Sequence, residues 1–161
     1  MRKGILLVSS LAGFRGTQLV IPYAATKAFI WNLAEGLHYE FKDKGLDISV
    51  LCPGTVDTPG FRATEAKTTF FTPKPMSPLS VAEIAVAKFG RQLFIVPGLS
   101  NKFAHFLLQR VLPRKLSSKI HNDAMGGLYQ DKMMIYRILI RDGWSLSGVR
   151  WSAFAKNLGL I

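Results

Sequence analysis

This chain of 161 residues lacks a second cysteine and a long apolar run, and each absence excludes a class of protein. The only cysteine, Cys52, excludes an intramolecular disulfide framework and is typical of a reducing compartment, where we expect it to be a small buried core thiol. The apolar run between Gly4 and Ser9 has four residues, too few for the core of a signal peptide, and no run is long enough to span a bilayer. We therefore expect a cytoplasmic protein, or one that binds a membrane peripherally.

Acidic residues are missing from one long stretch. No Asp or Glu lies between Glu83 and Asp123, although the formal net charge of the chain is +11. The cations of this stretch are Lys88, Arg91, Lys102, Arg110, Arg114, Lys115 and Lys119. Such an excess fits nucleic acid, an anionic membrane or an acidic cofactor as partner. The sequence has neither an RNA-binding signature nor histidines at metal-ligand spacing, so we expect no nucleic acid and no metal site.

What is present predicts a parallel α/β sheet. Gly4–Ser9 and Leu46–Leu51 read as buried strands, and a helix that begins near Pro22 and closes at Lys44-Gly45 separates them. The apolar positions that recur at helical spacing are Ala24, Ala25, Ala28, Phe29, Leu33, Leu37 and Phe41. Since ligands of such sheets bind beyond the carboxyl ends of the strands, Ser10 and Pro53-Gly54 are expected at one functional edge.

The next part of the chain predicts a lid, a helix and a third strand. Residues 61–78 are rich in Thr, Pro and Lys with weak periodicity, which indicates a loop over a cleft. The sequence Ser80-Val81-Ala82-Glu83 matches a capping box, so we expect a helix from Ser80 to about Gln92. Leu93–Val96 follows as a short strand that ends at Pro97-Gly98.

A basic amphipathic helix is predicted from Asn101 onward. Its apolar face comprises Phe103, Phe106, Leu107, Val111 and Leu112, beside the cations Lys102, Arg110, Arg114 and Lys115. Two interpretations remain open: the helix packs on the domain or on a partner subunit, or residues 101–119 lie on an anionic membrane surface. Residues 126–161 contain aromatic residues but no repeat or motif that indicates a role.

Ser10, Tyr23 and Lys27 form the spaced triplet S-x12-Y-x3-K. Tyr23 and Lys27 are four residues apart, so on a helix their side chains share one face. An ammonium group held near a phenol favours the phenolate, and a phenol tuned in this way acts as a general acid or base. The triplet therefore predicts a catalytic site.

Three segments around this triplet carry a family resemblance: G-I-L-L-V-S-S-L-A-G-F-R-G from Gly4 to Gly16, P-Y-A-A-T-K-A-F around Tyr23, and C-P-G-T-V-D-T-P around Gly54. Over residues 1–98 they resemble the short-chain dehydrogenase/reductase family. The resemblance implies hydride transfer between NAD or NADP and a carbonyl or alcohol, with Tyr23 as acid/base. It also implies that Ser10 orients the substrate oxygen and that Lys27 acts on Tyr23 and on the nicotinamide ribose. The cofactor-binding residues implied are Tyr23, Lys27, Pro53, Gly54, Val56 and Thr58.

The glycine-rich turn that binds a dinucleotide pyrophosphate is missing from this sequence. Gly13 and Gly16 follow the serine strand and do not form G-x-G. We therefore expect a fragment: a partial Rossmann-like, doubly wound sheet that lacks its amino-terminal half (residues 1–98). A helical carboxyl-terminal extension follows, made of the basic segment 99–122 and a tail, 123–161.

Such a half sheet would expose an edge and apolar surface, which is a poor arrangement for a stable monomer and makes a homo-oligomer one expectation. The favoured function is an oxidoreductase, and the lipophilic helix after Pro97 suggests a lipophilic substrate. The alternative is a non-catalytic module, membrane-associated or protein-binding, that retains half of an enzyme scaffold.

Overall fold

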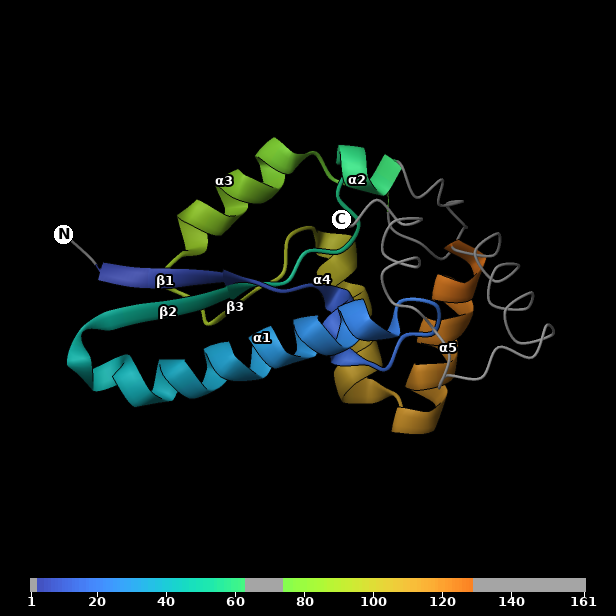
Figure 1. Cartoon of the computed structure of the whole chain (residues 1–161), viewed down its shortest axis with the longest axis horizontal. Coiled ribbons are helices and arrows are strands. Elements are labelled where there is room, and N and C mark those ends of the chain that lie inside the picture. The colour runs from blue at the N-terminus through green and yellow to red at the C-terminus, as the bar shows by residue number, and fades with distance from the viewer. Residues whose placement is uncertain (1–2, 63–73, 129–161) are drawn as a thin grey trace, which may run out of the picture. The chain divides into compact units, whose positions relative to one another are not determined.

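The computed structural model describes residues 3–62 and 74–128. Within them three parallel strands form one sheet in the order β1 (Lys3–Val8), β2 (Leu46–Leu51) and β3 (Phe94–Ile95). The register of β1 on β2 runs from Lys3 opposite Leu46 to Val8 opposite Leu51. Because all three strands run the same way, their carboxyl ends meet at one edge of the sheet (Figure 1). The predicted α/β fold with a parallel sheet is confirmed.

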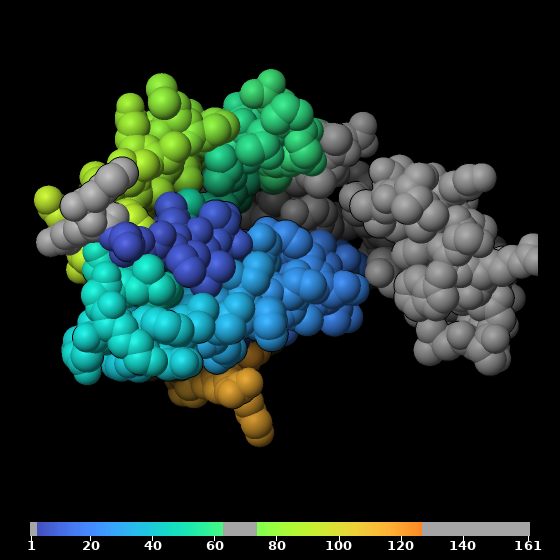
Figure 2. All heavy atoms as spheres, turned by 60° about the vertical axis from the view of Figure 1, so that its left-hand side comes forward, coloured from blue at the N-terminus to red at the C-terminus, as the bar shows by residue number. Residues whose placement is uncertain are grey.

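One side of β1 has no strand beside it among the described residues. Figure 2 shows β1, in dark blue, at the surface between α3 (Pro78–Lys88) and α1 (Ile21–Phe41). Two of its apolar side chains, Ile5 and Val8, are exposed. The sheet is therefore partial, with helices on both faces, and its β1 edge is open among the described residues, as the sequence predicts.

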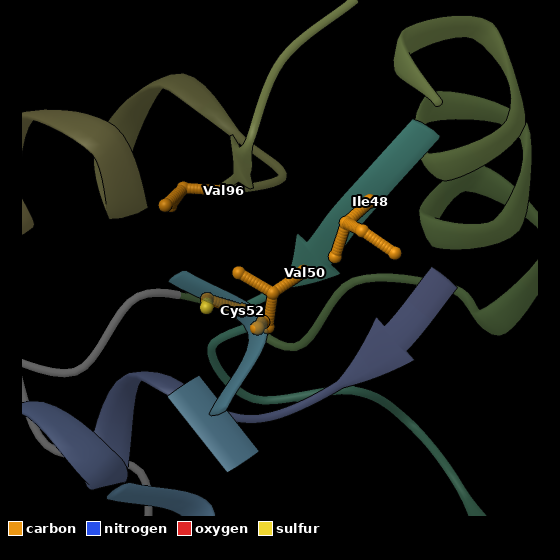
Figure 3. Packing of buried hydrophobic residues seen from close by; sticks show 5 residues of the cluster. Ile48, Val50, Cys52 and Val96 are labelled. Atoms are coloured by element: carbon orange, nitrogen blue, oxygen red, sulfur yellow. The ribbon is translucent and has the colours of Figure 1, made fainter. Parts of the chain in front are cut away.

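Helix α1 covers one face of the sheet. It has Pro22 in its first turn, where the missing proline N–H costs nothing, and it ends through a short 3-10 turn at Gly45. Gly45 has φ 71°, the left-handed conformation that glycine adopts most readily. Beneath α1, the side chains of Ile48 and Val50 on β2 and of Cys52 just after it pack in a cluster with Ala34 and Val96 (Figure 3). The predicted helix and the predicted buried thiol are both confirmed.

Helix α3 covers the other face, where Leu51 and Ile95 pack against Val81 and Ala85. The predicted start of this helix at Ser80 is wrong. Proline is favoured in a first helical turn, so the helix begins at Pro78 and Ser77 is its cap, with Ser77 Oγ accepting from the Ser80 N–H at 3.1 Å. The predicted end near Gln92 is also wrong, because the helix stops at Lys88 ahead of Gly90, whose φ is 69°.

The remaining predicted segments differ in length from what is observed. The third strand has two residues where four were expected. Of the lid segment 61–78, residues 63–73 lie outside the described part of the chain, and its start belongs to the short helix α2 (Pro59–Arg62).

The single basic helix predicted over residues 101–119 is wrong. The structure has α4 (Leu99–Phe106), a π-helical turn (Leu107–Val111) and a separate helix α5 (Arg114–Leu128). Pro113 causes the break, because proline disfavours helical backbone in the residue before it, and Leu112 is accordingly extended. Both helices lie at the carboxyl edge of the sheet (Figure 1).

All described residues belong to one compact unit, Met1–Tyr129. The predicted boundaries after residues 98 and 122 stay predictions, and most of the tail lies outside the described residues. No helix in the described ranges is long and apolar enough to cross a membrane.

Candidate active site

Two hydrogen bonds join Lys27 on α1 to the carboxyl end of β1. Lys27 Nζ donates to the backbone carbonyl of Val8 at 3.1 Å. In return, Ser9 Oγ donates to the backbone carbonyl of Lys27 at 2.7 Å, and Ser9 is buried. The side chain and the backbone carbonyl of Lys27 are thereby both fixed at the edge of the sheet, and Ser9 has a structural role there.

Tyr23 lies one helical turn before Lys27, as predicted. Lys27 Nζ is 5.5 Å from the centroid of the Tyr23 ring. The ring is 48% exposed, and its hydroxyl has no hydrogen-bond partner among the described residues. The phenol is therefore free to meet a ligand while a fixed ammonium group lies beside it.

Ser10 lies immediately beyond the same strand end. Its Oγ accepts from the Ala12 N–H at 3.2 Å and caps the 3-10 turn Leu11–Phe14. The next residue, Leu11, donates its N–H to the carbonyl of Pro53 at 3.0 Å. The serine segment and the Pro53-Gly54 turn are therefore neighbours, which confirms that these segments meet at one edge.

Gly54 is close to a buried residue that the sequence did not single out. A Cβ atom at position 54 would lie 2.7 Å from Asn101 Oδ1 and 2.9 Å from Asn101 Cγ. Asn101 is 2% exposed, and its Nδ2 donates to the carbonyl of Pro97 at 2.9 Å. Glycine at position 54 thus makes room for Asn101, and its approach to a nicotinamide stays a prediction.

Val56 and Thr58 both have local structural roles. Val56 forms an isolated parallel bridge with Met76. Thr58 Oγ1 accepts from the Phe61 N–H at 3.1 Å and so caps α2. An ordinary turn after the strand would make the same contacts, so a cofactor role for either residue stays a prediction.

The connecting loop, residues 15–20, leads from the serine segment into α1, and residues of the α4–α5 region hold it in place. Arg15 donates through Nε to Ser117 Oγ at 3.3 Å and through Nη2 to the carbonyl of Leu108 at 3.2 Å. The ring of Phe14, just before the loop, lies 4.2 Å from the ring of His105, centroid to centroid. The α4–α5 region therefore supports the path from Ser10 to Tyr23.

Helix α5 also contacts this loop. We call the contacts of residues 14–18 with α4, the π-helical turn and α5 the clamp. Thr17 Oγ1 and His121 Nε2 are 2.9 Å apart, and the Gln18 N–H donates to Asn122 Oδ1 at 2.8 Å. Next in the loop, Leu19 has φ 68°, a conformation that is uncommon for a residue other than glycine and that neighbouring contacts must hold in place. Sequence reasoning missed these residues because the partners are 104 positions apart and share no local pattern.

The two histidines of this region have lowered pKa values. Burial is the main cause for both, because it disfavours the charged imidazolium. The positive charges of Arg110 and Arg15 lower the pKa of His105 further, and Arg15 does the same for His121. Both side chains therefore favour the neutral form in the folded protein.

A cleft of about 600 Å³ lies on a different side of α1 from the triplet. Its helical wall is Ile21, Ala24, Ala25 and Ala28. At 3.6 residues per turn, the centre of this wall is about 130° around the helix from Tyr23 and Lys27. The cleft is therefore separate from the candidate site.

Cys52 and the acidic residues provide no alternative chemistry. Burial raises the pKa of the Cys52 thiol to about 12, and a hydrogen bond with Ser9 opposes this only in part. No three His, Cys, Asp or Glu side chains within residues 3–62 and 74–128 are grouped as metal ligands.

A nicotinamide ring and its ribose suit the residues at this edge. The Tyr23 hydroxyl has no partner within residues 3–62 and 74–128, and the Lys27 ammonium group is held at the strand end. The pyrophosphate has no counterpart, because the sequence contains no G-x-G turn between a strand and a helix. The fit is thus to the reactive end of the cofactor.

The architecture and the site together define a doubly wound α/β protein with a Ser-Tyr-Lys triplet at the carboxyl edge. Residues 2–69 match the sequence profile of the short chain dehydrogenases. The 17-beta-hydroxysteroid dehydrogenase type 3 of Mus musculus is 42% identical over 59 residues, which are 36% of this chain and 19% of the mouse protein. The very-long-chain 3-oxoacyl-CoA reductase of Anas platyrhynchos is 42% identical over 57 residues, 35% of this chain and 18% of that enzyme.

Two solved structures of dehydrogenases are similar to this chain in fold. A short-chain dehydrogenase from Sphingobium yanoikuyae in complex with NADPH superposes with a TM-score of 0.52 at 26% identity, covering 60% of this chain and 38% of the other. A 7beta-hydroxysteroid dehydrogenase shares the fold, with a TM-score of 0.62 at 24% identity over 73% of this chain and 45% of the other. Over residues 2–69 the chain is similar to the short chain dehydrogenases, and it spans about a fifth of the length of the two curated relatives named.

Proposed function

We propose that this chain carries the proton-transfer residues of an NAD(P)-dependent oxidoreductase that interconverts a carbonyl and an alcohol. The observation that carries the proposal is the placement of Lys27. Its ammonium group donates to the carbonyl of Val8 and lies 5.5 Å from the ring of Tyr23, whose hydroxyl has no hydrogen-bond partner in the described part of the chain. A general acid needs such a combination of an accessible proton and a charge that stabilises the ion left behind.

Each member of the triplet has one role in this proposal. The Tyr23 hydroxyl gives its proton to the carbonyl oxygen during reduction and takes it back during oxidation. Lys27 stabilises the phenolate and hydrogen-bonds the nicotinamide ribose. Ser10 Oγ donates to the substrate oxygen, where preorganised hydrogen bonds stabilise developing charge. When bound, the nicotinamide supplies or accepts the hydride.

The turn that follows β2 forms the cofactor side of the site in this proposal. Pro53 and Gly54 place backbone beside the nicotinamide, and Val56 and Thr58 lie further along, toward its carboxamide and the pyrophosphate. The hydrogen bond from Leu11 to the Pro53 carbonyl supports this assignment, because it brings the turn next to the serine segment.

We propose a lipophilic substrate. The names of the two curated relatives refer to a hydroxysteroid and to a very-long-chain 3-oxoacyl-CoA, which are large and mostly apolar molecules. Exposed apolar residues on α4, at the same edge of the sheet, also support it. The family match favours the oxidoreductase over the alternative of a non-catalytic module.

The test is NADH- or NADPH-dependent reduction of a steroid ketone, a long-chain 3-oxoacyl thioester and a small polar ketone. It uses the whole protein encoded by the transcript that carries these residues. Tyr23→Phe removes the proton donor and should lower kcat/KM about 10²- to 10⁴-fold, the usual contribution of general acid–base catalysis. Tyr39→Phe, an exposed tyrosine on the same helix, is the matched control and should leave it unchanged.

Two results would count against the proposal. Turnover that Tyr23→Phe leaves intact would remove the acid/base role. Turnover of the small ketone alone would keep the reaction but refute the lipophilic substrate.

A further inference from the structure

Helix α4 is amphipathic, but its apolar side chains face the solvent and a polar side chain faces the domain. Leu99, Phe103 and Phe106 follow one another at intervals of four and three residues, so they form one stripe, and they are 84%, 68% and 57% exposed. The opposite side of the helix carries a polar residue, Asn101, which is buried. The apolar face of this helix is thus turned to the solvent, the opposite of what a helix on a globular core shows.

The buried side of α4 is fixed, so the stripe cannot turn inward. Asn101 Nδ2 donates a hydrogen bond to the carbonyl of Pro97, and the Asn101 side chain fills the space beside Gly54. His105 stacks on Phe14 on the same side. Rotating the helix to cover its phenylalanines would break these contacts and bury exposed charge.

Positive charge lies on the same helix as the stripe and on the segments that follow it in the sequence. Lys102 lies on α4 next to it, and four more exposed cations follow: Arg110, Arg114, Lys115 and Lys119. No acidic residue occurs between Glu83 and Asp123 to neutralise them. Exposed aromatic and aliphatic side chains flanked by cations are the pattern of a helix that lies in the interface of an anionic membrane.

We propose that α4 docks the protein on an anionic lipid bilayer, with Leu99, Phe103 and Phe106 inserted at the boundary of headgroups and acyl chains. Lys102 and Arg110 contact lipid phosphates. With eight residues α4 is too short to span a bilayer, so the proposed contact is one of lying on the surface. Since Asn101 of α4 touches Gly54, docking also brings the candidate site close to the lipid.

The charges favour lipid over a second copy of the chain. A symmetric dimer through this stripe would bring the same patch from both copies together. Lys102 and Arg110 of one copy would then approach the same cations of the other, and neither α4 nor the π-helical turn carries an acidic residue to pair with them, which is unfavourable. The docking does not depend on the proposed oxidoreductase activity and can be tested without it.

The experiment is co-sedimentation of the full chain with vesicles of phosphatidylcholine alone or with ~30% phosphatidylserine at low salt. We expect binding to the anionic vesicles that falls as salt is raised. Phe103→Ser should weaken binding about tenfold or more, because one buried aromatic side chain is removed from the lipid. Phe29→Ser is the matched control, since Phe29 is 67% exposed on α1, and it should bind like the wild type.

A second pair of variants separates charge from apolar insertion. Lys102→Gln with Arg110→Gln should lower binding to phosphatidylserine vesicles about tenfold or more, whereas Lys42→Gln with Lys44→Gln, at the far end of α1, should not. All these side chains are at the surface, so circular dichroism is expected to show unchanged folding.

Three outcomes would overturn the proposal. The first is binding that is equally strong with and without phosphatidylserine. The second is a loss of vesicle binding that is equally large for Phe29→Ser and Phe103→Ser. The third is a dimer in size-exclusion chromatography, without lipid, that Phe103→Ser dissociates. That result would assign the stripe to a second copy.

Discussion

The side chain of Asn101 occupies the space that a side chain at position 54 would need. A Cβ atom there would lie only 2.7 Å from Asn101 Oδ1, closer than real Cβ contacts come. Asn101 is buried and hydrogen-bonded to Pro97, so it cannot swing away without leaving polar atoms unpaired. The turn after β2 and the helix α4 are therefore fitted to each other.

Gly54→Ala is expected to destabilise the protein by about 1–3 kcal/mol, the usual cost of overpacking a closed site. Urea unfolding followed by circular dichroism measures it. Gly60→Ala is the matched control, because a Cβ at position 60 meets nothing within 4 Å. In a double-mutant cycle with Asn101→Ala, the two changes should couple by ~1 kcal/mol or more, and simple additivity would contradict the fit.

Ser9→Ala is expected to lower the free energy of unfolding by about 1 kcal/mol, the typical net value of one hydrogen bond. The lost bond is the one from Ser9 Oγ to the carbonyl of Lys27. Ser100→Ala, on the exposed surface of α4, provides the control for a serine without this role. An unchanged melting temperature for Ser9→Ala would show that the bond does not hold β1 to α1.

Stability is expected to fall as the pH drops below about 6.5. Burial lowers the pKa of His105 and His121, so the unfolded chain binds protons at a pH where the folded protein keeps both imidazoles neutral. The stabilisation is fully present above the ordinary histidine pKa and is lost as the pH falls through the folded-state values. Melting curves between about pH 8 and pH 5 follow this loss.

His121→Gln isolates one of these histidines. Glutamine keeps a hydrogen-bonding group near Thr17 Oγ1 but does not titrate. The variant should show a flatter dependence of the melting temperature on pH than the wild type. Parallel curves would assign the acid sensitivity to other groups.

Cys52 is expected to react very slowly with a thiol reagent in the folded protein. Its pKa is raised to about 12 by burial, so at pH 8 only about one thiol in ten thousand is ionised. The rate of reaction with Ellman's reagent should rise at least a thousandfold in denaturant. Fast labelling without denaturant would show that the core cluster opens readily.

Residues 1–161 by themselves are expected to show no saturable binding of NADH or NADPH. A dinucleotide gains much of its affinity from a glycine-rich turn at a helix amino terminus, and the sequence has no such turn. Cofactor fluorescence titration measures this, with a complete NADPH-dependent dehydrogenase as positive control. Tight binding would mean that other residues hold the pyrophosphate.

Regular elements could be predicted from the sequence where local patterns decide them. The helix Ile21–Phe41 has a proline in its first turn, recurring apolar residues and Gly45 at its end, and these signals agree. The strand Leu46–Leu51 alternates between the two helical layers and was found residue for residue. The edge where Ser10 meets Pro53 followed from the rule that parallel strands end together.

Other features depend on contacts between residues that are far apart in the sequence, so no local sequence pattern predicts them. The cap at Ser77 was missed because Ser80 matches a capping box equally well, and only Pro78 in the first turn decides between them. The exposure of Phe103 and Phe106 depends on Asn101 having a place beside Gly54, which is 47 positions earlier in the sequence. The interactions of Thr17 and Gln18 with α5 are equally invisible to a search for motifs.

The clamp on the connecting loop has a consequence for how the protein is made. The ribosome synthesises Arg15 and Thr17 long before their partners Leu108 and His121, which follow 93 and 104 residues later. A nascent chain that has reached only α3 already contains the serine, tyrosine and lysine of the site. The support for the loop between them is synthesised only after α3 and β3, so the loop can take its observed path only once α4 and α5 have been made.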